Sequence, residues 1–153
     1  MKRTRCGFFG FTLIELLIVI AILGILALVV LIAINPAKRQ NEAKDSQVKT
    51  DIGQIATGLQ AYFTSSDQGS GTYPTSLDKL ATNKDIIRVP TSPSGGSYSY
   101  DVSPAGCLGT LSSPCTDAKL SYFLYAPQTV GDVWCFQSSA GKAQEIAPAS
   151  CTP

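Results

Sequence analysis

The chain has 153 residues, of which 44% are hydrophobic and 15% are charged, and its formal net charge is +1. This length predicts one compact domain with an accessory element, not two domains. The basic residues include Lys2, Arg3 and Arg5, so the chain after residue 10 carries nine basic and eleven acidic side chains. Without a basic cluster, that balance argues against nucleic acid as the main partner.

The chain contains no histidine, and this absence excludes several classes of enzyme. Ser-His-Asp catalysis, Cys-His catalysis and histidine-ligated metal chemistry all need an imidazole. No C-x-x-C pair occurs either, so a zinc site is disfavoured. These classes of catalysis are therefore excluded.

Residues 11–34, FTLIELLIVIAILGILALVVLIAI, form an almost uninterrupted apolar run. At ~1.5 Å per residue, a helix of this length reaches across the ~30 Å hydrocarbon core of a bilayer. The basic residues before the run predict a cytoplasmic N-terminus and export of the remainder, although Lys38 and Arg39 weaken that bias. A cleaved signal peptide is the alternative, but its apolar core is only ~7–15 residues long. We predict a membrane helix that is retained.

A single carboxylate, Glu15, interrupts this run near its start. A charged side chain costs roughly 2.5–3.5 kcal/mol at the centre of a bilayer, so Glu15 either snorkels to the surface or needs a cationic partner. Cleavage after Gly10 would give Phe11 a new α-amino group, and residues 11 and 15 share one helix face. That group would be a partner for the carboxylate, in the same chain or in a neighbour.

The stretch GFTLIELLIVIAILGILA, with the basic leader before it, resembles the type III signal of type IV prepilins and type II secretion pseudopilins. The resemblance implies that prepilin peptidase cuts between Gly10 and Phe11 and N-methylates Phe11. Residues 1–10, with Cys6, would be the leader that is removed. Glu15 would then pair with the α-amino group of a neighbouring subunit's Phe11 during assembly. The resemblance implies a structural subunit that needs no cofactor and catalyses no reaction itself.

The same resemblance implies partners and a location. The precursor would cross the bacterial inner membrane once, with its N-terminus in the cytoplasm. An inner-membrane assembly platform with its ATPase would then add copies to a helical homo-oligomer, which is either an extracellular type IV pilus or a periplasmic type II pseudopilus. The sequence separates neither these two filaments nor a major from a minor subunit.

A monomeric binding protein, anchored by one membrane helix and carrying an exported ligand-binding head, is the alternative function. The sequence favours the filament subunit, because a simple anchor has no use for the Gly10–Phe11 junction or for Glu15.

Residues 35–64 are expected to continue the helix as an amphipathic segment that packs on the protein's own sheet. Gly24 and Pro36 are the positions at which this long helix should bend or loosen. The apolar residues of the segment recur at spacings of three and four: Val48, Ile52, Ile55, Leu59, Tyr62 and Phe63.

Residues 65–153 are expected to form a loop and a sheet, called the head. A short helix is predicted near Thr75, because Thr75-x-x-Asp78 has the form of a capping box. Residues 97–102, 120–126 and 133–137 have the pattern of strands, with a weaker fourth at 142–146. The predicted fold is α+β, with a long spine helix packed on a small antiparallel sheet of three or four strands, as in pilins.

Four cysteines remain after the leader: Cys107, Cys115, Cys135 and Cys151. An even number in a small exported domain predicts two disulfides, for which three pairings are possible. We favour Cys107 with Cys115 and Cys135 with Cys151, because each pair closes a local loop.

The sequence also suggests two ligands for the head, calcium and carbohydrate, but in each case a simpler use of the residues is favoured. Asp101, Asp117 and Asp132 could contribute to a calcium site, but acids without EF-hand spacing are more often solvated loop residues. A carbohydrate-binding aromatic face is conceivable, although sheet core and subunit contacts are the simpler use of such side chains. The aromatic residues in question are Tyr98, Tyr100, Tyr122, Phe123, Tyr125, Trp134 and Phe136.

Overall fold

The structure is a computed structural model that describes residues 10–153. The expected leader, with Cys6, therefore lies outside the described residues except for Gly10. The chain divides into two compact units, Met1–Arg39 and Gln40–Pro153. The second unit contains the head.

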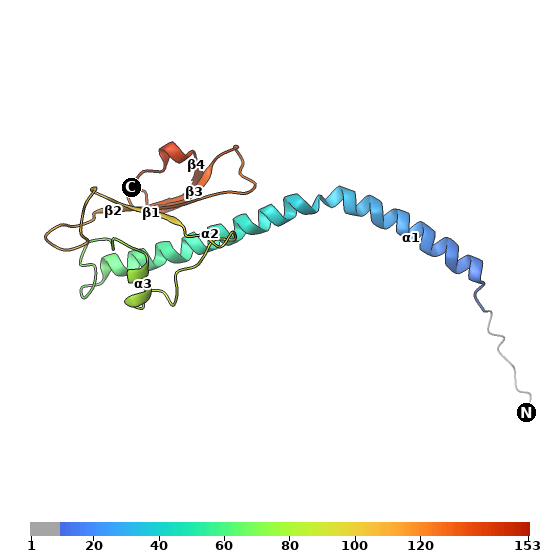
Figure 1. Cartoon of the computed structure of the whole chain (residues 1–153), viewed down its shortest axis with the longest axis horizontal. Coiled ribbons are helices and arrows are strands. Elements are labelled where there is room, and N and C mark those ends of the chain that lie inside the picture. Colours follow the sequence, from blue (N-terminus) through green and yellow to red (C-terminus); the bar gives the residue numbers. More distant parts are fainter. Residues whose placement is uncertain (1–9) are drawn as a thin grey trace, which may run out of the picture. The chain divides into compact units, whose positions relative to one another are not determined.

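The first helix, α1, runs from Leu13 to Ile34 (Figure 1). Apolar residues lie on every side of it. Its large hydrophobic side chains are between 46% and 83% exposed. Within residues 10–153, this is the one helix whose length and composition would let it cross a membrane. A helix that is hydrophobic on all sides needs lipid or other protein around it, because exposing its apolar side chains to water is unfavourable.

The helical segment is interrupted at Asn35, whose φ of 46° lies in the left-handed region that Asn tolerates. Pro36 causes the interruption, since a proline disfavours the helical conformation of the residue before it. Pro36 is itself the first residue of α2, Pro36–Thr64, where its missing N–H costs nothing. The Asn35 carboxamide accepts a hydrogen bond from the backbone N–H of Lys38 at 3.3 Å. Gly24, the other expected weak point, lies inside α1 without interrupting it.

The sheet of the head has four antiparallel strands in the order β1-β2-β3-β4, each beside its neighbour in sequence. The strands are β1 Ser99–Ser103, β2 Asp117–Phe123, β3 Val133–Gln137 and β4 Lys142–Ile146. β3 and β4 have the bounds predicted from sequence, whereas β1 begins two residues later and ends one residue later than predicted. The prediction for β2 was wrong by three residues at each end. Tyr125 and Ala126 leave the ladder because their backbone N–H groups bind the side chain of Asp45.

A short helix, α3, spans Asp78–Thr82. The capping box predicted for Thr75 and Asp78 is wrong, because the helix begins too late for Thr75 to cap it. The hydroxyl of Ser76 instead accepts a hydrogen bond from the backbone N–H of Asp78 at 3.3 Å.

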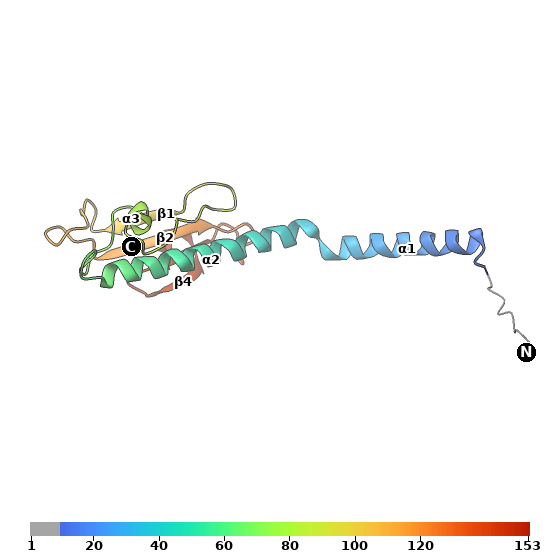
Figure 2. The same ribbon diagram turned by 90° about the horizontal axis from the view of Figure 1, so that it is seen from below.

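The core of the head lies between α2 and one face of the sheet (Figure 1, Figure 2). The predicted apolar stripe of α2 supplies its helical side, with Phe63 only partly buried. Burying one such side chain contributes roughly 1.5–3 kcal/mol. The fully buried members of the core include Val48, Ile52, Ile55 and Leu59 from α2, Leu80 from α3, and Ala118 and Leu120 from β2.

A buried carboxylate fastens the connection between β2 and β3 to α2. Asp45 is only 5% exposed. Its two carboxylate oxygens accept hydrogen bonds from the backbone N–H groups of Tyr125 at 2.7 Å and Ala126 at 2.8 Å. The ammonium group of Lys44 lies 4.8 Å from the centre of the Tyr125 ring. This Asp45 clamp joins parts of the chain that are about 80 residues apart.

A second polar contact joins α2 to the segment that leads into β1. The hydroxyl of Tyr98 donates a hydrogen bond to the carboxylate of Asp51 at 2.6 Å. Burial raises the pKa of Tyr98, and the hydrogen bond to the Asp51 carboxylate raises it further. Burial likewise raises the pKa of Tyr100, whose hydroxyl donates to the carbonyl of Pro74 at 2.7 Å.

We expect Asp45→Ala to lower the free energy of unfolding by about 2–3 kcal/mol, because two N–H groups lose a charged acceptor. Asp45→Asn keeps one carbonyl acceptor and should be intermediate. The matched control is Asp67→Ala, which removes an exposed carboxylate and should change stability by less than about 0.5 kcal/mol. Denaturant unfolding of the full chain in detergent, followed by Trp134 fluorescence, measures the three values. Equal losses for Asp45→Ala and Asp67→Ala would refute the clamp.

The raised tyrosine pKa values predict that the head loses stability at alkaline pH. Their contribution is complete below pH about 10, the ordinary value for tyrosine, and is lost as the pH rises toward the folded-state values. Tyr98→Phe should reduce this loss, and Tyr98→Phe/Tyr100→Phe should reduce it further. Thermal unfolding between pH about 8 and 11 tests the expectation. A double variant with the same alkaline loss as the unaltered chain would contradict it.

Candidate functional site

The predicted processing junction precedes α1 in non-helical backbone. Gly10, Phe11 and Thr12 all lie outside the helix, which begins at Leu13. Phe11 is 81% exposed. A Cβ added to Gly10 would have no described atom within 4 Å. The peptide bond between residues 10 and 11 therefore lies outside the helix and joins two exposed residues.

Thr12 and Glu15 form a capping box at the start of α1. The Thr12 hydroxyl accepts a hydrogen bond from the backbone N–H of Glu15 at 3.3 Å. One carboxylate oxygen of Glu15 accepts from the backbone N–H and from the hydroxyl of Thr12, each at 2.8 Å. These bonds satisfy N–H groups that the first turn of a helix leaves without partners.

This role of Glu15 was missed in the sequence analysis. The pattern Thr12-x-x-Glu15 is itself a capping-box signature and directly precedes a long apolar run. The carboxylate also lies in the first turn of α1, where the helix dipole favours negative charge. Glu15 thus has hydrogen-bond partners in its own chain. They lower the free-energy cost of a carboxylate at the start of an apolar helix. Its pairing with the α-amino group of Phe11 stays a prediction, since residue 11 is here still joined to Gly10.

The four cysteines of the head form two disulfides, Cys107–Cys115 and Cys135–Cys151, which are the pairs favoured from the sequence. The second bridge ties the C-terminal segment to β3. The side-chain amide of Gln137 on the same strand donates to the carbonyls of Ser150 at 3.2 Å and Thr152 at 2.9 Å. The C-terminal segment is therefore held by both a covalent bond and hydrogen bonds.

The three aspartates considered for calcium do not gather into one site. Asp101 pairs with Lys119 at 3.3 Å, and Asp117 accepts a hydrogen bond from the hydroxyl of Thr116 at 3.1 Å. Asp132 lies in the turn before β3. Across residues 10–153, no group of three or more Asp, Glu, Cys or His side chains is placed to hold a metal ion. Calcium binding by the chain stays an untested prediction.

Comparison with known proteins bears on the amino-terminal segment. Residues 5–31 match the family model described as the prokaryotic N-terminal methylation motif. This motif is the one expected from the resemblance to type IV prepilins. Gly10, Phe11, Thr12 and Glu15 all lie within the matched residues, and the match ends inside α1.

A stretch of 61 residues is 43% identical to the type IV major pilin protein PilA of Myxococcus xanthus (strain DK1622). The stretch covers 40% of this chain and 27% of that relative, so the chain matches about a quarter of the relative's length. No solved structure matches the chain. The resemblance to type IV prepilins is thus confirmed at the amino-terminal end, and the apolar helix with a four-stranded antiparallel sheet confirms the expected α+β, pilin-like fold.

Proposed function

We propose that the chain is a structural pilin subunit that polymerises from the bacterial inner membrane into a filament, either a type IV pilus or a type II secretion pseudopilus. The observation that carries this proposal is the methylation motif at the start of a helix that is apolar on all sides. In this role the subunit catalyses no reaction of its own.

The exposure of α1 supports two successive environments for this helix. Before assembly, the surrounding lipid would cover its apolar side chains in a single membrane pass with the N-terminus in the cytoplasm. In the filament, the α1 helices of other copies would replace the lipid. The driving force would be packing between helices, because lipid tails are as apolar as the helix itself. An assembly platform with its ATPase would extract the subunits.

The geometry of the junction supports cleavage by prepilin peptidase between Gly10 and Phe11. A protease needs an extended substrate, and the capping box of Thr12 and Glu15 keeps residues 10–12 out of α1. Cleavage would create an α-amino group at Phe11, which the peptidase would then methylate.

The new charge at Phe11 gives Glu15 a second role in the filament. The α-amino group of an incoming subunit would be buried in a medium of low dielectric constant, where an unpaired charge is costly. A neighbour's Glu15 can neutralise this group only when the two helices have the correct axial register. The ion pair would therefore specify geometry more than it adds stability.

The mature N-terminus is expected to be N-methyl-Phe11, and mass spectrometry of the membrane fraction measures it directly. Gly10→Val should leave the full-length precursor, because a branched side chain beside the cleaved bond would obstruct the peptidase. Gly53→Val, at an exposed glycine of α2 with open space around it, is the matched control and should be processed normally. A mature chain that begins at any other residue would contradict the assignment.

Glu15→Ala should be inserted into the membrane and processed but should enter filaments poorly, because stranding a buried charge costs roughly 3–5 kcal/mol. Glu15→Gln keeps an acceptor without the charge and should be intermediate at best. Thr12→Val removes the capping hydroxyl but leaves the carboxylate, so it should assemble nearly as well as the unaltered chain. Each variant is expressed together with the unaltered subunit, and both are quantified in sheared filaments.

The same assay separates the pilin subunit from an anchored monomer. An anchored monomer would yield no sheared polymer even for the unaltered chain, and that result would refute the proposal. Equal incorporation of Glu15→Ala would refute the ion pair. Equally poor incorporation of Thr12→Val and Glu15→Ala would show that Glu15 acts only as a helix cap.

A further inference from the structure

The sheet of the head has a second face, opposite the one that α2 covers. Side chains alternate between the two faces of a strand, so Lys119, Ser121 and Phe123 of β2 project from this outer face, while Leu120 points into the core. Ser99 of β1 lies directly opposite Ser121 in the ladder, and Asp101 lies opposite Lys119.

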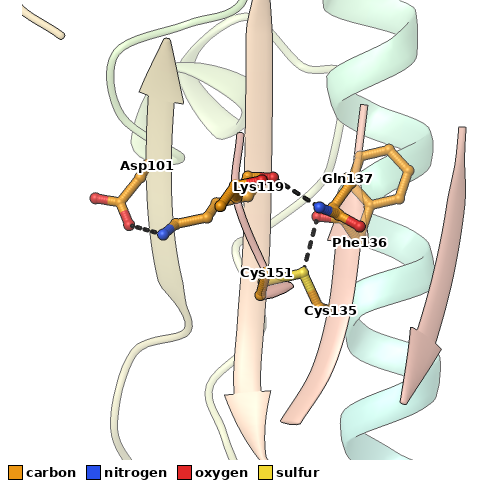
Figure 3. A network of polar contacts seen from close by, with 7 residues as sticks. Asp101, Lys119, Cys135, Phe136, Gln137 and Cys151 are labelled. Atoms are coloured by element: carbon orange, nitrogen blue, oxygen red, sulfur yellow. Dashed lines mark hydrogen bonds and ion pairs between the residues drawn. A yellow bond between two sulfur atoms is a disulfide. The ribbon is translucent and has the colours of Figure 1, made fainter. Parts of the chain in front are cut away.

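The C-terminal segment covers only part of the outer face. The Cys135–Cys151 bridge, visible in Figure 3, holds this segment over β3. The amide of Gln137 adds its hydrogen bonds to the carbonyls of Ser150 and Thr152. A groove of about 380 Å³ remains beside it over β1 and β2. This outer groove is lined by Ser97, Ser99, Lys119, Ser121, Phe123 and Pro148, among others. Its size lies within the range of ~300–1,000 Å³ found for small-molecule sites.

The polar groups of the outer groove are available to a ligand. The hydroxyls of Ser97, Ser99 and Ser121 make no side-chain hydrogen bond within the described residues. Lys119 extends toward Asp101, and the ammonium and carboxylate groups are 3.3 Å apart (Figure 3). The Asp101 side chain is 57% exposed, so the pair offers both donors and acceptors at the surface.

Phe123 provides an apolar platform at the end of β2. It is 64% exposed, although Val133, its partner across the ladder in β3, is buried. The other face of the same strand contributes Ala118 and Leu120 to the core, so the sheet fixes the backbone that carries the ring. An exposed aromatic side chain on a rigid element suits a ligand that has a flat apolar face.

We propose that the outer groove binds a neutral saccharide, with the Phe123 ring against an apolar face of a sugar and the serine hydroxyls bonded to its hydroxyl groups. A pyranose ring combines these two surfaces, and the groove presents their complements side by side. The Lys119–Asp101 pair would bind further hydroxyl groups.

Other classes of ligand fit the outer groove less well. A peptide that adds to a sheet needs the backbone groups of an edge strand, whereas the groove lies on the face of β1 and β2. A nucleic acid needs several unpaired cations, whereas the one lysine that lines the groove is paired with Asp101. A purely apolar ligand would strand the three serine hydroxyls.

The test uses the full chain in a zwitterionic detergent, because detergents with glucose or maltose headgroups would compete for the site. The probes are cellotetraose, maltotetraose and chitotetraose, and binding is measured by saturation-transfer-difference NMR with titration. We expect at least one probe to bind with a Kd of about a millimolar or tighter. Binding should persist when salt is raised from about 50 to 500 mM, because the ligand is uncharged.

Variants assign binding to the outer groove. Phe123→Leu keeps an apolar side chain but removes the ring and should weaken binding about tenfold. Ser121→Ala should weaken it about threefold or more. The matched controls are Leu111→Ala, another exposed apolar residue, and Ser139→Ala, an exposed serine in the turn between β3 and β4. Both should bind as the unaltered chain does, and thermal unfolding checks that every variant is folded.

Three results would overturn the proposal. The first is that none of the probes binds. The second is unchanged binding by both Phe123→Leu and Ser121→Ala, and the third is loss of binding at high salt. These results do not depend on filament assembly, because the experiment uses subunits dispersed in detergent.

Discussion

The packing of one face of α2 against one face of the sheet determines how the rest of the chain can be used. Val48, Ile52, Ile55 and Leu59 are fully buried in this contact. Because α2 covers a single face, the other face of the sheet is left to the C-terminal segment and the outer groove. The large apolar side chains of α1 are exposed among the described residues. One interface therefore separates a head with its own core from a helix that needs lipid or other copies around it.

The head adds polar contacts to this apolar interface, and they give it a precise arrangement. Hydrophobic burial is non-directional, so it does not by itself choose how α2 lies on the sheet. The Asp45 clamp and the bond from Tyr98 to Asp51 are directional, and both begin on α2. They also connect α2 to two different parts of the sheet region. The two disulfides then restrict the loops at which a small domain would otherwise fray.

Glu15 shows how one carboxylate can serve successive needs. In the chain as described, it caps α1 through Thr12 and so avoids being an unpaired charge beside an apolar helix. In the proposed filament it would face an α-amino group that exists only after cleavage. The bonds to Thr12 lower the free-energy cost of a carboxylate in the membrane before assembly. Their exchange for an ion pair with another subunit would then favour the correctly aligned filament.

The sequence alone determined the features that depend on local pattern. The apolar run predicts α1, the spacing of the stripe predicts the buried face of α2, and the cysteine spacing favours the two bridges that the structure contains. Even the interruption at Asn35 follows from Pro36, a neighbour in sequence. The bounds of β3 and β4 also agree with their local signals.

Only the tertiary structure decided the features that depend on distant partners. β2 does not extend to residue 126 because Tyr125 and Ala126 bind Asp45, about 80 positions earlier, and no local pattern encodes that contact. The outer groove exists because β1, β2 and the C-terminal segment come together in space. The capping box was assigned to Thr75 and not to Thr12 because several segments share the same short signature. Which of them starts a helix is settled by the packing around each segment, because a four-residue pattern contributes only about 1 kcal/mol.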